Sequence, residues 1–317
     1  MDTQVPKVSV CLITYRHELY IEQAIESILI QKVNFAWEII IADDCSPDGT
    51  RDIILKYQQL YPELIHTVFQ RENVGPGKNF VDLVNAARGT YIAYIEGDDY
   101  WSDEYKLQKQ FNFMQRHPDF SLCYHKIKWV YTYETVHDAD AESNTADPPV
   151  STIYDVLEKG WFIRSCSMFY VNFRLPPGFA DLFIGDFPLH VLLADKGRVG
   201  FLNECMGIYR INNKGLSETT LTSANITSLR KNVNDQIYML KYLNLQTGFK
   251  YKSLINSKII DELYRLLSSA FKTNMVLFLS ECKNTVATNG IKFVVTGFIK
   301  RGCSKIRLIK SEVTFKK

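Results

Sequence analysis

Apolar and polar positions alternate in blocks along the first hundred residues. Short, mostly apolar blocks rich in β-branched residues occupy 8–13, 37–44, 66–70 and 90–96, and such blocks are typical of buried strands. The segments between them, 19–31, 50–61 and 80–89, carry apolar residues at helical spacing or end at a helix-stopping glycine. This order, β-α-β-α-β-α-β, predicts an α/β fold with a Rossmann-like, mostly parallel central sheet and helices on both faces.

The second half of the chain is less regular. Residues 151–172 predict a helix, a turn at Gly160 and a strand, and a further helix after Asp186 precedes a strand near 199–208. Residues 137–150 are acidic and poor in apolar side chains, which is typical of a mobile surface loop. From about residue 219 the pattern is helical.

These patterns predict two domains. Residues 1–217 form the α/β domain, with a first half at 1–100 and a second half at 101–217, and residues 218–317 form a helical, basic C-terminal extension. The last 30 residues or so contain a single acid, Glu312, and many basic residues. These basic residues are Lys292, Lys300, Arg301, Lys305, Arg307, Lys310, Lys316 and Lys317. They predict either contact with anionic lipids or a solvated helical face.

Composition excludes several classes of protein. The chain has 317 residues with 46% hydrophobic residues, enough for a large core, and its net charge of +2 gives no reason to expect nucleic-acid binding. The 7 cysteines form no CxxC pair, so we expect neither a zinc site nor a disulfide framework, in a reducing compartment. We also expect no signal peptide and no membrane-spanning helix, hence a cytoplasmic protein.

Polar side chains follow three of the predicted strands: Thr14-Tyr15, Asp43-Asp44 and Glu96 to Asp99. The carboxyl ends of parallel strands share one edge of a sheet, where ligands bind. Crowded carboxylates repel one another unless a cation lies among them, and Mg²⁺ or Mn²⁺ prefers such oxygen ligands, with phosphate completing the shell. The alternative is a solvated turn in which Asp98 or Asp99 caps a helix that begins near Ser102.

Four motifs together resemble the family 2 inverting glycosyltransferases of the GT-A fold: PKVSVCLITYRHELYIEQAIESIL, EIIIADDCSPDGT, ENVGPGKNF and GTYIAYIEGDDYW. The resemblance covers about residues 6–217, and EGDDYW resembles a bacterial subgroup that builds cell-surface polysaccharides. It implies a metal-dependent, inverting enzyme with Mn²⁺ or Mg²⁺ as cofactor. Its donor would be a nucleotide-diphosphate sugar, with a UDP-sugar favoured, and its acceptor a glycan or a lipid-linked saccharide. The resemblance implies no oligomeric state.

The resemblance also assigns a nucleotide-sugar site. Asp44 matches the aspartate that accepts a hydrogen bond from uracil, and Glu96 replaces the usual first aspartate of the DxD element. Which acid binds the metal therefore stays open, with Asp98 and Asp99 favoured. Core packing for Tyr15, a helix cap for Glu18 and a surface turn for the glycine-rich stretch are the alternatives. The nucleotide-sugar residues are Thr14, Tyr15, Glu18, Asp43, Asp44, Asn73, Lys78, Asn79, Glu96, Asp98 and Arg210.

The same resemblance implies the residues that act on the acceptor. Asp186, in GDFPL, matches the general base, and a helix cap is a compatible role for it. Trp101, Trp161 and Arg164 are expected to line the acceptor side, although a core role for Trp161 is equally open. In YRINNKGLS, which resembles a loop over the diphosphate, Asn212 stands in place of the usual histidine, and Arg210 or Lys214 would compensate.

Two other classes of protein remain as alternatives. A nucleotidyltransferase on a similar sheet would carry a longer, basic, glycine-rich signature near the first strand, which LITYRHELY lacks. A non-catalytic binding or scaffold relative is opposed by the acids Asp44, Asp98, Asp99 and Asp186, while Glu96 and Asn212 leave it open. The enzyme hypothesis requires Asp44, Asp98 and Asp186 to meet around one cation-held diphosphate.

Overall fold

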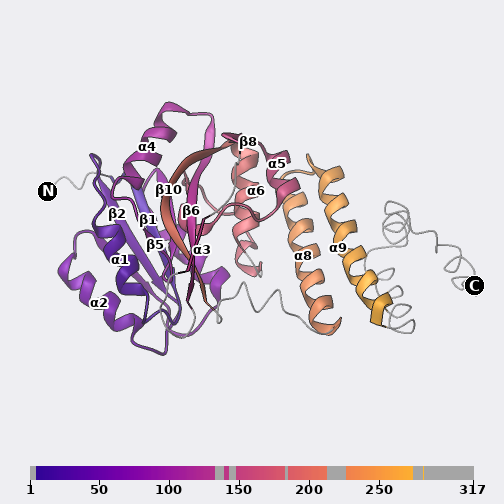
Figure 1. The fold of residues 1–317 in the computed structure, drawn as a ribbon, viewed down its shortest axis with the longest axis horizontal. Coiled ribbons are helices and arrows are strands. Elements are labelled where there is room, and N and C mark those ends of the chain that lie inside the picture. The colour runs from indigo at the N-terminus through magenta and orange to yellow at the C-terminus, as the bar shows by residue number, and fades with distance from the viewer. Residues whose placement is uncertain are drawn as a thin grey trace, which may run out of the picture. The chain divides into compact units, whose positions relative to one another are not determined.

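The chain forms two compact units, Met1–Gly215 and Leu216–Lys317. The computed structural model describes residues 5–132, 139–142, 148–182, 185–212, 226–273 and 281. The first unit is built on one sheet and the second is helical (Figure 1). The basic residues from Lys292 onward, together with Lys214, lie outside the described residues.

The first four strands are parallel, as their apolar blocks predict. They are β1 (Val8–Thr14), β2 (Trp37–Asp43), β3 (Ile65–Phe69) and β4 (Tyr91–Glu96), and they lie in the order β3-β2-β1-β4. Their side chains are almost entirely enclosed: Val8, Val10 and Leu12 of β1 are 0% exposed. Both faces of these strands must therefore be covered, which explains why they are continuously apolar rather than alternating.

The helices between these strands cover the two faces. They are α1 (Ile21–Leu29), α2 (Thr50–Leu60) and α3 (Pro76–Ala86). From β1 to β3 the chain advances toward one edge of the sheet, and from β3 it crosses back to β4. Because such crossovers are right-handed, α1 and α2 lie on one face and α3 on the other. The direction of winding reverses between β1 and β4, and ligands of open α/β sheets bind at this point.

The second half of the unit extends the same sheet with mixed strand directions. The order continues β4-β9-β6-β10-β5, with β9 (Phe169–Val171), β6 (Phe120–Thr132), β10 (Arg198–Asn212) and β5 (Tyr100–Trp101). Helices α4 (Lys106–Arg116), α5 (Ile153–Lys159) and α6 (Asp186–Lys196) accompany them. The short 3-10 turns are η1 (Ser165–Ser167) and η2 (Phe179–Asp181). The predicted helix, turn and strand at 151–172 and the helix at Asp186 are confirmed, whereas α4 and β6 carried no prediction.

The predicted surface loop at 137–150 is wrong in part. Residues Ala139–Glu142 form β7, which pairs antiparallel with β6 from Lys128 to Tyr131, and β8 (Val150–Ser151) pairs with β10. Strand β6 is 13 residues long, and β9 pairs with it only at Leu122 and Cys123. The rest of that edge of β6 would expose unpaired backbone groups, and β7 satisfies part of them.

The second unit contains two packed helices, as the helical pattern after residue 219 predicts. Helices α8 (Ile226–Gln246) and α9 (Lys252–Thr273) lie side by side (Figure 1). They bury residues at three- and four-residue spacing: Val233, Ile237, Leu240, Leu243, Ile255, Ile259, Leu263, Leu266 and Ala270. Gly248 has a φ of 59° in the turn between them, which glycine adopts without strain. Of the helices that the structure describes, none is apolar over the length needed to cross a bilayer.

Candidate active site

A tight turn at the end of β4 gathers three carboxylates at the point where the winding reverses. The Asp99 amide donates to the Glu96 carbonyl across this turn, at 3.1 Å. A Cβ at Gly97 would lie 2.7 Å from Thr14 Oγ1 and 2.8 Å from His17 Nδ1, both in the segment that follows β1. Glycine is therefore required here, because a side chain would push the acidic turn away from the end of β1.

The turn forms a cluster suited to a divalent cation. Glu96, Asp98 and Asp99 each offer one oxygen, and these oxygens lie within 4.8 Å of one another. Burial and the neighbouring Asp98 charge raise the pKa of Glu96 and Asp99 well above the ordinary values. Asp99 Oδ2 is buried without a hydrogen-bond partner among the described residues, and the nearby Cys166 thiol stabilises the charge only weakly. An unsatisfied buried carboxylate oxygen fits a Mg²⁺ or Mn²⁺ ligand.

Arg210 of β10 holds this turn in place. Its backbone amide donates to Asp99 Oδ1 at 2.8 Å, and Nη1 donates to the Asp98 carbonyl at 2.6 Å. Its guanidinium also bonds Gln23 and lies over the rings of Tyr20 and Tyr100, at 5.1 and 4.5 Å. Arg210 therefore fixes the acidic turn through these hydrogen bonds. The phosphate contact predicted for it remains a prediction.

His17 joins the end of β1 to the acidic turn and was missed by the sequence analysis. Its Nδ1 lies 3.1 Å from Thr14 Oγ1, and its Nε2 lies 3.8 Å from Asp98 Oδ2. Thr14 is 2% exposed, so its hydroxyl acts here as the orienting partner of the imidazole. A titratable side chain three residues after a polar strand end was the available signal.

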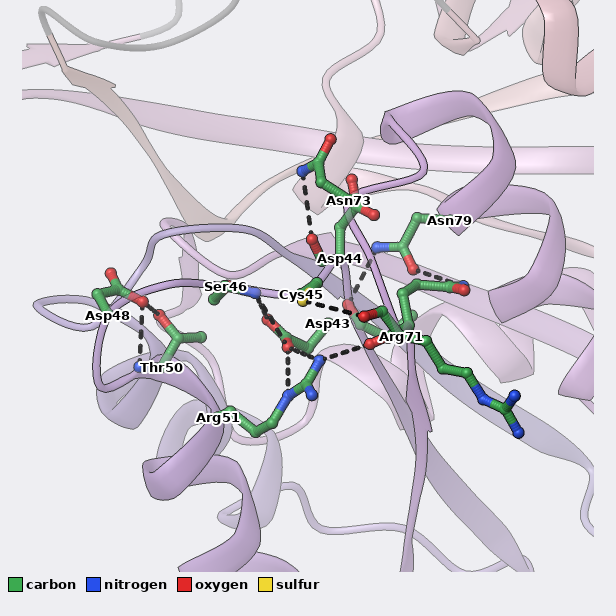
Figure 2. A network of polar contacts seen from close by, with 12 residues as sticks. Asp43, Asp44, Cys45, Ser46, Asp48, Thr50, Arg51, Arg71, Asn73 and Asn79 are labelled. Atoms are coloured by element: carbon green, nitrogen blue, oxygen red, sulfur yellow. Dashed lines mark hydrogen bonds and ion pairs between the residues drawn. The ribbon is translucent and has the colours of Figure 1, made fainter.

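The acids at the end of β2 bind partners from the chain itself, and Figure 2 shows those of Asp43. Asp43 is 0% exposed and pairs with the Arg51 guanidinium, whose Nη2 lies 2.6 Å from Oδ2, while the Ser46 amide also donates to it. Asp44 accepts the Val74 and Gly75 amides at 2.7 and 3.0 Å. Burial raises the pKa of Asp44 although these two amides oppose the shift. Both acids therefore stabilise the loops at this edge.

The other predicted nucleotide residues surround this edge of the sheet. Asn73 donates to the Asp44 carbonyl and the buried Asn79 to the Ala42 carbonyl (Figure 2). The exposed Glu18 accepts the Gly49 amide at the start of α2, which is the helix-capping role left open above. Half-buried Tyr15 lies under the Arg16 guanidinium, and Lys78 pairs with Asp82 on its own helix. Their contacts to a nucleotide stay predictions.

The predicted base lies within electrostatic reach of the acidic turn. The Asp186 charge is among the causes that raise the pKa of Glu96. Surrounding protein atoms raise the pKa of Asp186 itself, and the Arg164 charge lowers it. Because the Asp186 side chain still faces solvent, we expect the net shift to be modest. Asp44, from the end of β2, reaches the same edge: its amide donates to the Thr14 carbonyl.

Of the three residues predicted to line the acceptor side, two lie beside Asp186 and one does not. Trp161 is 38% exposed, and its ring lies 4.9 Å from that of Phe187, next to Asp186. Arg164 is close enough to Asp186 for its positive charge to lower the pKa of that carboxyl group. Trp101 is 2% exposed, and its Nε1 donates to the Cys166 carbonyl. The prediction that Trp101 lines the acceptor side is therefore corrected: Trp101 is a core residue, enclosed because β5 pairs with β10.

Helix α4 begins with Lys106, a second residue that the sequence analysis missed. Lys106 is 0% exposed, and its Nζ lies 3.9 Å from the centre of the Trp101 ring. This Nζ atom has no hydrogen-bond partner in the described part of the chain. Burial lowers the pKa of Lys106 to about 7. The side chain of Asn212, the residue in place of the family histidine, lies outside what the structure describes.

Comparison with known families assigns the chain that carries this site to a family. The family described as Glycosyl transferase family 2 matches residues 9–175, which include the ends of β1, β2 and β4. The chain belongs to glycosyltransferase family 2. The mixed sheet, which is parallel in its first four strands and carries the acidic turn at its switch point, is thus the GT-A fold that the motifs predicted.

Two relatives and two solved structures illustrate the similarity. A protein of Mycobacterium tuberculosis (strain ATCC 25618 / H37Rv) is 35% identical over 222 residues, which are 68% of this chain and 61% of the relative. The "Putative teichuronic acid biosynthesis glycosyltransferase TuaG" of Bacillus subtilis (strain 168) is 31% identical over 233 residues, 70% of this chain and 86% of its own. The match thus spans less than two thirds of the mycobacterial relative.

The solved structures support the fold. S. aureus TarS 1-349 superposes with a TM-score of 0.53 at 18% identity and covers 93% of this chain and 92% of TarS 1-349. The mannosyltransferase PcManGT of Pyrobaculum calidifontis gives a TM-score of 0.51 at 14% identity, covering 94% and 87%. At these identities the likeness concerns the fold of the chain and not its substrates.

Proposed function

We propose that this glycosyltransferase moves a sugar from a nucleotide-diphosphate donor, with a UDP-sugar favoured, to a glycan or lipid-linked acceptor, with inversion at the anomeric carbon. The observation that carries the proposal is the convergence at the β1/β4 switch point of the acidic turn and Asp186. TarS structures with UDP and UDP-GlcNAc support a sugar-nucleotide donor, and the name of TuaG supports a role in surface polysaccharide synthesis. We place the reaction in the cytoplasm, where sugar nucleotides are available.

In this proposal Asp186 is the general base. Its carboxylate accepts the proton of the acceptor hydroxyl as the hydroxyl oxygen attacks the anomeric carbon. The bond to the diphosphate breaks on the opposite face of the sugar, and the nucleoside diphosphate leaves with the bonding electron pair. The position of Asp186 at the first turn of α6, exposed to solvent, leaves its carboxylate accessible to an incoming hydroxyl.

The acidic turn would hold the cofactor. Asp98 and Asp99 are the proposed ligands of Mn²⁺ or Mg²⁺, with Glu96 beside them, and PcManGT was solved with Mn²⁺ and GDP-Man. The bound ion supplies positive charge that stabilises the departing diphosphate. His17 and Arg210 orient the turn, and the loop at Asn73 to Asn79, with Asp44 behind it, is proposed to contact the nucleotide.

The proposal is tested by nucleotide release from a panel of UDP- and GDP-sugars with Mn²⁺. We expect one donor class to be turned over by the wild-type protein. Asp186→Asn should lower turnover by about 10²- to 10⁴-fold, the usual contribution of a general base, without lowering the melting temperature. Asp181→Asn, which changes another exposed acid in the same region, should leave turnover unchanged.

The same panel excludes the alternatives. If UDP and Mn²⁺ raise the melting temperature but no donor is turned over, the protein is a non-catalytic relative. If no sugar nucleotide binds in the presence of metal, the transferase proposal is wrong.

A further inference from the structure

We propose that Arg164 binds an anionic group of the acceptor, so that the acceptor is an acidic or phosphate-bearing saccharide and not a neutral one. This inference rests on the proposed function, because it concerns the acceptor of the transfer at Asp186. It adds the charge of the substrate, which the motifs do not specify.

Arg164 is held in a fixed place beside Asp186. Its carbonyl accepts the Ser167 amide at 3.0 Å and the Ser167 hydroxyl at 2.7 Å, which fixes the backbone before η1. Its guanidinium lies 4.5 Å from the centre of the Trp129 ring and 5.8 Å from that of Tyr209. These two rings lie on the neighbouring strands β6 and β10 and make a T-shaped contact, with their centres 5.0 Å apart. Stacking on aromatic rings orients a guanidinium while leaving its N–H groups available for hydrogen bonds.

The Arg164 guanidinium has no acid to pair with among the residues that the structure describes. No carboxylate oxygen there lies within 4.0 Å of it, and its side chain donates no hydrogen bond to a described residue. Five other arginines of the described residues are paired with acids: Arg51 with Asp43, Arg88 with Glu38, Arg198 with Asp119, Arg230 with Glu281 and Arg265 with Glu262. A half-buried guanidinium without an anion in contact has lost hydration, and the contacts with the aromatic rings offset this loss only in part. An oxyanion of a ligand would supply that compensation through two parallel hydrogen bonds.

The surroundings of Arg164 form the remaining parts of a saccharide site. The half-exposed Trp161 ring, three residues earlier, offers an aromatic face for a sugar ring, and Asp186 offers the acceptor for a hydroxyl proton. This site is otherwise acidic, because Glu96, Asp98 and Asp99 lie within electrostatic reach of Asp186 or of one another. An anionic acceptor would be repelled by these acids, and Arg164 is placed to offset the repulsion on the Asp186 side.

The test is an array of neutral, uronate-bearing and phosphate-bearing saccharides, probed with the full chain in the presence of UDP and Mn²⁺. We expect the wild-type protein to bind acidic saccharides and not their neutral counterparts. Arg164→Gln should weaken this binding by about 10- to 100-fold, the range expected for charge-assisted hydrogen bonds. Arg164→Lys should recover only part of it, because an ammonium group lacks the planar fork. Arg174→Gln, which removes another, exposed arginine of the same unit, should bind like the wild type.

The array distinguishes the sources of the anion and the ways in which the inference can be wrong. Preference for uronates indicates a carboxylate, and preference for phosphorylated saccharides indicates a phosphate. The inference is contradicted if the wild-type protein binds neutral saccharides, and also if it binds no saccharide of the array. So does an equal loss of binding in both glutamine variants. Hydrolysis of the sugar nucleotide without acceptor should be within about 3-fold of wild type in the control Arg174→Gln, because Arg174 is not among the proposed site residues. If the wild-type protein hydrolyses no sugar nucleotide at all, the proposed function is wrong instead.

Discussion

The ends of β2 and β4 both carry adjacent aspartates, but the chain treats them differently. At β2, Asp43 pairs with Arg51 (Figure 2). Asp44 accepts two backbone amides, so both acids are satisfied internally. At β4, Asp99 keeps a buried oxygen without a described partner, and three carboxylates share one turn. The comparison teaches that acids neutralised by the chain serve the fold. Acids left unsatisfied at a switch point are available for an external cation.

Removing the charge at β2 should have the largest effect on stability. Asp43→Asn leaves the Arg51 guanidinium without its buried carboxylate, and breaking such pairs costs about 3 kcal/mol. Urea denaturation at neutral pH measures this change in the free energy of unfolding. As a control, Glu104→Gln breaks the exposed ion pair with Lys32 and should cost less than about 1 kcal/mol. Equal small losses in the two variants would contradict a structural role for Asp43.

Lys106, the first residue of α4, should make the free energy of unfolding depend on pH. Its folded pKa of about 7 lies below its ordinary value of 10.5, so the unfolded chain binds more protons between these values. Stability then rises with pH in that window, by at most about 1.4 kcal/mol per pH unit. Buried thiols such as Cys123 oppose this above their ordinary pKa of 9.0, so the rise is expected from pH 7 to 9.

Lys106→Met isolates this contribution. Urea denaturation from pH 7 to 9 should show a flatter profile in the variant and higher stability at pH 7, because methionine is buried without a charge to desolvate. Lys109→Met changes an ion-paired lysine one turn along the same helix and should keep the wild-type slope. If the slope of Lys106→Met is also unchanged, Lys106 is not the responsible group.

Neutralising an acid at β4 should change the free energy of unfolding in the opposite direction to neutralising one at β2. Without metal, Asp99→Asn should raise stability by about 1 kcal/mol, because an unpaired buried amide costs less than an unpaired carboxylate and repulsion from Asp98 is removed. Mn²⁺ should raise the melting temperature of the wild type and of Asp43→Asn, but much less that of Asp99→Asn. Destabilisation of Asp99→Asn in the absence of metal would show that Asp99 also serves the fold.

The first half of the fold could be predicted from the sequence because each buried parallel strand is a continuous apolar block bounded by turn residues. The strand ends followed from that order, and so did their convergence. Segment 106–132 was missed, since β6 mixes polar and apolar residues without a regular period and its pairing partners are distant in sequence. The site was only partly predictable: nothing local to Trp101 shows that β10 encloses it, or that Arg210 is used within the acidic turn.

The smallest predicted effect compares two histidines, one from each region. His17 lies 3.8 Å from Asp98 at the β4 turn, and His66 lies 3.9 Å from Glu38, away from that turn. His17→Gln should weaken the binding of UDP with Mn²⁺ by about 3-fold, because it removes a weak, partly exposed contact that orients one proposed metal ligand. His66→Gln should leave this affinity unchanged, although it alters a histidine–carboxylate contact of nearly the same length. Titration calorimetry with UDP in saturating Mn²⁺ measures both. Equal affinities in the two variants would mean that Asp98 is positioned by its backbone and Arg210 alone, since the Arg210 guanidinium already fixes the Asp98 carbonyl.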